Sequence, residues 1–247
     1  MIHIFELRFD KSALSHVPEA ERILYFMLGE VANDLSTLSK QAMFWIQPQD
    51  GQSEIHEFAR TSAAFLNLKL LAGRIYEAWN LLKKAEHSRV FAAYRQDLDQ
   101  GALDALSTIK KYFNTTNNLI NHLRNKLAFH SDFETVKSAY AALPNEEPLC
   151  DFIAQHVGNT FYNSAHLIAV HSAKHLSGMP DIPSALDKTT TEILNLSHLV
   201  GLYAHGYASV FAARYLEPLH DLSGPREHQI EDAPRLSEIR TPYFYME

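Results

Sequence analysis

Apolar side chains recur at every third or fourth position along most of this chain, which is the spacing of an amphipathic helix. The first stripe starts after Pro18 and ends at a break over residues 47–51; it contains Ile23, Leu24, Met27, Leu28, Val31 and Leu35. Nine glycines and ten prolines among 247 residues are few for the many tight turns of a β-sandwich or barrel. We therefore predict an all-α fold, an up-and-down bundle of about seven helices.

Capping residues and breaks divide the rest of the chain. Further helices are expected at 54–85 behind Ser53, at 90–98, at 103–113 after a break at Gly101, and over the segment NLINHLRNKLAFH. A capping box at residues 131–134 predicts a short helix that Pro144 stops. Two long helices are expected at 149–176 and 189–215, the second behind a capping box formed by Thr189 and Glu192. Residues 2–9 suit one short strand at most.

The domain organisation follows from composition. We predict one helical domain over residues 1–220 and an extended C-terminal tail over 221–247, packed on the body or on a partner through its aromatic end, Tyr243 to Tyr245. The charge-free stretches 152–173 and 193–213 contain Asn, Ser and His, so we interpret them as buried helices and not as membrane spans. A single cysteine, Cys150, and the absence of a secretory signal in the first residues indicate a cytoplasmic protein.

Charge excludes some function classes. A net charge of −7 does not attract nucleic acid to the whole surface, so an anionic partner requires a local basic patch.

The sequence contains no P-loop, no dinucleotide fingerprint and no Gly-x-Ser-x-Gly elbow. These absences remove common nucleotide-binding and hydrolase classes.

One short segment carries a pattern associated with catalysis. Arg124 is followed by the polar Asn125 and, six residues after the arginine, by His130, at the end of an amphipathic segment. The chain has one other Arg-to-His pair at such a spacing, Arg214 with His220, but that pair lacks a polar neighbour and contains Pro218. The segment 124–130 resembles the R-x4-6-H motif of the HEPN superfamily of small helical proteins.

The resemblance implies an HEPN-like helical core and a homodimer in which two motif helices line one cleft. It also implies a metal-independent endoribonuclease, without cofactor, that acts as a toxin or defence component and has an antitoxin protein as a partner. In such an enzyme His130 acts as general base or acid, Arg124 holds the phosphate, and the amide of Asn125 orients His130 or the phosphate. The expected product is a 2′,3′-cyclic phosphate, and DNA is spared because it has no 2′-OH.

Local charge adds a candidate RNA-binding set. Residues 105–131 contain no Asp or Glu, whereas they carry several cations, of which we assign Lys110, Lys111, His122 and Lys126 to RNA contact.

Structural interpretations of the same residues stay open. Arg124 can pair with a carboxylate such as Glu77 or Glu30, and His130 can satisfy the last carbonyls of its helix. The chain is then a non-catalytic helical binding or dimerisation module. Tyr76, Glu77 and Trp79 are interpreted as ordinary core and edge residues.

Other polar groups have two interpretations each. His171 and His175 have the spacing of a shared metal site, but solvated or hydrogen-bonded histidines are the expected state, so no metal is predicted. Two polar stripes either face a common cleft or simply face water. They comprise Asn195, His198, His205 and Ser209 on the last helix and Gln155, Asn159, Asn163 and His166 on the one before.

Overall fold

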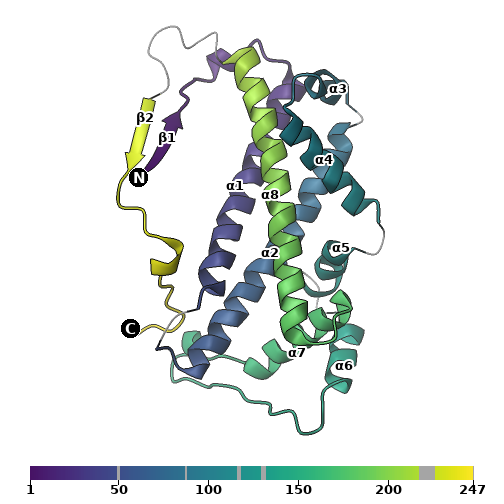
Figure 1. Ribbon diagram of the computed structural model, residues 1–247, viewed down its shortest axis with the longest axis vertical. Helices are drawn as coiled ribbons and strands as arrows, with labels where there is room; N and C mark the ends of the chain where they lie inside the picture. Colours follow the sequence, from purple (N-terminus) through teal and green to yellow (C-terminus); the bar gives the residue numbers. More distant parts are fainter. Residues whose placement is uncertain (49–50, 87, 116–117, 129–131, 217–225, 247) are drawn as a thin grey trace.

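Long helices dominate the computed structural model, which describes residues 1–247 except 49–50, 87, 116–117, 129–131, 217–225 and 247. The helices α1 (Glu19–Ile46), α2 (Glu54–Glu86) and α8 (Ile182–Tyr215) run side by side along the length of the molecule (Figure 1). Their contact surfaces are apolar, with Leu28, Leu35, Leu71, Ile75, Leu82, Tyr203, Tyr207 and Phe211 almost fully buried. The predicted all-α bundle is confirmed.

Shorter helices cover one side of this framework. They are α3 (Arg89–Arg95), α4 (Gln100–Phe113), α5 (Leu119–Leu123), α6 (Phe133–Ala141) and α7 (Asn163–Ser177). α4 packs closely on α8, because a Cβ added at Gly206 would lie 2.5 Å from the Cβ of Ala102. Glycine at this position allows the two backbones to approach.

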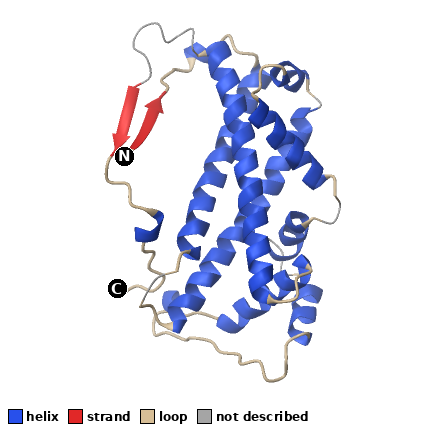
Figure 2. Cartoon of the chain, in the orientation of Figure 1, coloured by secondary structure: helices blue, strands red, loops and turns tan. Residues whose placement is uncertain are grey.

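Two strands form a small ribbon beside the bundle (Figure 2). The N-terminal strand β1 (Ile2–Glu6), which was predicted, pairs antiparallel with β2 (Arg226–Ile230), which was not. After β2 the chain runs in an extended path, interrupted by the 3-10 turn η5 (Leu236–Glu238), to the far end of α1 and α2. Tyr243 of this tail lies 6.1 Å from Trp45 and 6.0 Å from Phe161, measured between ring centroids, so the aromatic end packs on the body.

Three helix starts differ from the prediction because aspartates cap these helices. Gly101 is not a break but lies in the first turn of α4, where Asp99 accepts a hydrogen bond from the amide of Ala102 at 2.8 Å. α8 begins at Ile182 behind Asp181, so the capping box predicted at Thr189 and Glu192 is wrong. α6 is capped by Asp132; Ser131, the cap predicted there, lies outside the described residues.

The helix predicted at 149–176 is half wrong. Residues before Asn163 are not helical apart from the 3-10 turn η3 (Val157–Asn159), since Phe152 and Phe161 exchange two backbone hydrogen bonds of 2.8 Å. α7 then starts at Asn163, and the carboxylate of Asp151 accepts a hydrogen bond from the amide of Ser164. Among the described residues no helix is both long and apolar enough to cross a bilayer.

Candidate functional site

The segment that carries the motif is short and packs on α2. α5 begins behind Asn118, whose side chain accepts a hydrogen bond from the amide of Asn121 at 2.9 Å. Leu119, Ile120 and Leu123 are buried, and the backbone continues as a π-helical turn, η2 (Arg124–Ala128). π-turns widen a helix locally and are frequent at functional sites. Arg124 and Asn125 are the first residues of this turn, whereas His130 lies outside the described residues.

The guanidinium of Arg124 lies against α2. Its Cζ is 5.0 Å from the centre of the Tyr76 ring, and its Nη1 donates a hydrogen bond of 2.9 Å to Oδ1 of Asn125. Its Nη2 is 3.7 Å from a carboxylate oxygen of Glu77. Glu77 was one of the two partners considered from the sequence, whereas the other, Glu30, lies 3.9 Å from Arg74.

The Arg124–Glu77 pair is only partly shielded from water. The side chain of Arg124 is 34% exposed and that of Glu77 is 52% exposed. Exposed pairs of this kind contribute little to stability, about 0–1 kcal/mol. The pair therefore orients Arg124 without sealing it from solvent.

Tyr76 is a residue whose role the sequence did not reveal. It was interpreted as core or edge, like Trp79, which stacks on Phe113 with 5.1 Å between ring centroids. Tyr76 does pack against the core, and it also provides the aromatic surface under the arginine of the motif. The sequence offered Glu77 as a partner of Arg124, but nothing in it pointed to Tyr76, the residue immediately before Glu77.

The predicted RNA-binding cations do not form one continuous patch. Lys110 of α4 pairs with Glu86 at the end of α2, and its ammonium lies 5.6 Å from the centre of the Phe91 ring. Lys126 of η2 is 3.2 Å from Asp132. Lys111 is exposed on α4. The acid-free run 105–131 is therefore partly neutralised by carboxylates from outside it.

Asp132 is held in its charged form. The hydroxyl of Thr135 and the ammonium of Lys126 both donate to its carboxylate, and they lower the pKa of Asp132 below its usual value, with Thr135 as the larger cause. The same carboxylate caps α6. Lys126 thus helps to fix the start of α6, which competes with any contact between Lys126 and RNA.

His122 lines a pocket whose lining does not include Arg124. It lines a polar pocket with His175 of α7, Lys188 of α8 and Tyr112 of α4. Burial and the hydrogen bond that its hydroxyl donates to Glu192 raise the pKa of Tyr112, with burial as the larger cause. Of the four cations assigned to RNA, His122 is the one that lines this pocket.

Among the described residues, the other polar candidates, which are the histidine pair and the two stripes, do not form one site either. No group of three or more His, Cys, Asp or Glu side chains within the described part of the chain is arranged to hold a metal ion, and this includes His171 and His175. Asn195 and Ser209 are exposed on α8, and so are His198 and His205, which line a shallow groove against α1. The second predicted stripe is wrong, because Gln155 and Asn159 are not on α7.

No protein-family model, curated protein or solved structure matches this chain at a significant level. Its chemistry is therefore inferred from its own residues.

Proposed function

We propose that this chain is a metal-independent endoribonuclease that uses Arg124, Asn125 and His130. The setting of Arg124 carries the proposal: the guanidinium is oriented by Tyr76 and Asn125, yet its side chain is 34% exposed. A guanidinium that is oriented in advance loses less freedom when it binds a phosphodiester. Its contact with Glu77, at 3.7 Å between partly exposed groups, is weak enough to be exchanged for a phosphate.

The chemistry requires only these side-chain types. The ribose 2′-OH attacks the adjacent phosphorus while His130 takes its proton as general base, and the bond from phosphorus to the 5′-oxygen breaks as that oxygen regains a proton. Arg124 pairs with the non-bridging oxygens and stabilises the charge that develops on them. The amide of Asn125 holds Arg124 or the phosphate in position. The products are a 2′,3′-cyclic phosphate and a 5′-hydroxyl.

A cleavage assay with labelled RNA in EDTA tests this function. Arg124→Ala and His130→Ala should each reduce the rate about a hundredfold or more, the magnitude typical for loss of a general acid–base or of transition-state charge stabilisation. Arg95→Ala is the control for loss of an arginine, since Arg95 is exposed at the end of the short helix α3 and its loss should leave the rate unchanged. Equal rates in all four proteins would contradict the proposal.

A second function is favoured by one specific observation, the carboxylates that face Lys110 and Lys126. Neutralised cations attract RNA weakly, so the alternative is a non-catalytic helical binding module that associates with itself or with a protein partner. It predicts that Arg124→Ala changes self-association, measured by analytical ultracentrifugation, and that no cyclic phosphate forms. Detection of a cyclic phosphate product that disappears in His130→Ala would refute the alternative.

A further inference from the structure

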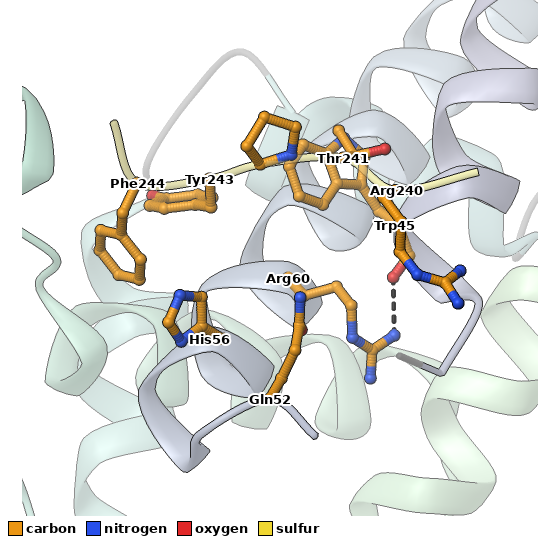
Figure 3. A pocket seen from close by; sticks show the side chains of 9 residues that line it. Trp45, Gln52, His56, Arg60, Arg240, Thr241, Tyr243 and Phe244 are labelled. Atoms are coloured by element: carbon orange, nitrogen blue, oxygen red, sulfur yellow. Dashed lines mark hydrogen bonds between the residues drawn. The ribbon is translucent and has the colours of Figure 1, made fainter. Parts of the chain in front are cut away.

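A second site lies at the opposite side of α2 from the motif segment, where the C-terminal tail crosses the body. The tail residues from Arg240 to Phe244 pass over the end of α1 and the start of α2 and enclose a cavity of about 290 Å³ (Figure 3). Trp45 of α1, His56 of α2 and Arg60 of α2 form its floor. The C-terminal tail thus meets the end of α1 and the start of α2, which are far from it in the sequence, at one small cavity.

The polar wall is built on Arg60. Its Nη1 donates to the backbone oxygens of Trp45, Ile46 and Gln47 at 2.7, 2.9 and 3.2 Å, and its side chain is only 12% exposed. The dashed line in Figure 3 marks the first of these bonds. The last carbonyls of a helix carry only a partial negative charge, about half an elementary charge in total. The guanidinium is therefore fixed in place while much of its positive charge stays uncompensated.

Arg240 brings a second guanidinium to the same cavity from the tail. Its Nη1 donates to the backbone oxygens of Ser237 and Ile239, at 2.8 and 3.3 Å. These bonds use one of its three nitrogens and no carboxylate. Within the part of the chain that the structure describes, one of these two arginines forms an ion pair. Arg60 contacts Glu57 at 3.4 Å, and the side chain of Glu57 is 69% exposed.

The apolar wall consists of aromatic rings at fixed angles. Tyr243 meets Trp45 edge to face, and Phe244 meets His56 at an interplanar angle of 89° with 5.1 Å between ring centroids. The Nδ1 of His56 is 2.7 Å from the hydroxyl of Ser53, which fixes the orientation of the imidazole. Figure 3 shows the imidazole and the Phe244 ring together at one end of the cavity and the two guanidiniums at the other.

This arrangement separates two kinds of recognition within one small cavity. Guanidiniums pair with phosphate oxygens through charged hydrogen bonds, and aromatic walls bind planar rings by stacking and edge contacts. A volume near the lower end of the range for small-molecule pockets limits the occupant to a compact ligand. We propose that the tail-covered cavity is a binding site for a small anion that carries a planar ring, of the nucleoside monophosphate class. The proposal does not depend on the ribonuclease function, because the two sites share no residue.

Titration calorimetry of the full chain with adenosine 5′-monophosphate, inorganic phosphate and adenosine tests the site. The nucleotide should bind saturably and about tenfold or more tightly than either fragment, since only the nucleotide reaches both walls. Tryptophan fluorescence of a Trp79→Phe chain reports on Trp45, the remaining tryptophan, and should change along the same binding curve. A parent chain that shows no saturable nucleotide binding would overturn the proposal.

Two substitutions test the contributions of the guanidinium wall and the aromatic wall to binding separately. Arg240→Gln should weaken nucleotide binding about tenfold to a hundredfold, because a charged hydrogen bond to phosphate is lost. Arg235→Gln, on the same tail but outside the cavity, should leave it unchanged. His56→Ala should weaken the nucleotide and leave inorganic phosphate unaffected. Equal affinities in Arg240→Gln and Arg235→Gln would overturn the assignment of the phosphate to this guanidinium.

Discussion

Two surfaces of this molecule present arginines, and they hold them in different ways. On the motif segment, Arg124 lies over Tyr76 beside the carboxylate of Glu77. Lys126 of the same segment and Lys110 of α4 are paired with carboxylates as well. At the tail-covered cavity, Arg240 is held by backbone oxygens, and Arg60 is held by three backbone oxygens and has one contact of 3.4 Å with the largely exposed carboxylate of Glu57. A carboxylate cancels a full positive charge, whereas carbonyls orient a guanidinium and cancel less of its charge.

The difference has a functional consequence. A paired arginine meets a phosphate only by exchange of partners, which suits a transient contact with a long polyanion. A carbonyl-held arginine keeps its charge available in a small, partly aromatic cavity, which suits retention of a compact anion. The net charge of −7 makes this local distinction more important than the field of the whole protein.

The largest difference between the two surfaces is expected in stability. Arg60→Ala removes three hydrogen bonds from the end of α1, and it should lower the free energy of unfolding by about 2 kcal/mol. Arg124→Ala should lower it by less than about 1 kcal/mol, because its ion pair is partly exposed. Urea denaturation of the two variants measures both values, and equal losses would show that the two arginines are held alike.

The next largest effect is expected in how the stability of the tail side of the molecule depends on pH. Burial, and secondarily the nearby charge of Lys69, lowers the pKa of His166 to about 4, and His166 packs on Phe161, which also contacts Tyr243. Between pH 6.5 and 4 the unfolded chain binds a proton at this histidine that the folded chain does not, so stability falls as the pH falls through this window. After allowance for partial solvent access, the loss is about 2 kcal/mol.

His166→Gln isolates this contribution from the other histidines. Urea denaturation at pH 7 and pH 4.5 should show a smaller pH dependence in this variant than in the parent. If the free energy of unfolding changes equally between the two pH values in both proteins, His166 does not contribute to the pH dependence.

The smallest expected effect concerns exchange at Arg124. Glu77→Gln removes the carboxylate that competes with phosphate for the guanidinium, so RNA should bind up to about fivefold more tightly. Fluorescence anisotropy with a labelled RNA measures the change. Asp34→Asn, which removes the nearer of the two carboxylates paired with Arg74 of α2, is the matched control. Weaker binding in Glu77→Gln would mean that the pair positions Arg124 and does not compete with RNA.

Much of the fold could be predicted because the apolar periodicity of long helices is visible in the sequence. The apolar stripe of α1 was readable from the local sequence, and the structure has it. The stretch 149–162 was misread because apolar residues such as Leu149, Phe152 and Ile153 fit helical spacing there. The backbone pairing between Phe152 and Phe161 that replaces the helix was missed because apolar spacing alone does not distinguish the two structures in a short apolar stretch.

The sites were less predictable because their geometry depends on residues distant in the sequence. The acid-free run around Lys110 indicated a basic patch, but Glu86 and Glu77 come from α2 and reduce its charge. The tail cavity gave one signal, the aromatic end of the chain. Nothing in the sequence placed Arg60 at the same cavity as Arg240, since the two residues are 180 positions apart.

Cleavage of a chimeric oligonucleotide tests the ribonuclease proposal most directly. The substrate is DNA with a single ribonucleotide, incubated with the parent chain and with His130→Ala in EDTA. The account predicts one cut, 3′ to the ribonucleotide, that leaves a 2′,3′-cyclic phosphate and is absent with His130→Ala. Cuts at deoxyribonucleotides, or no cut in this substrate or in all-RNA controls, would contradict it.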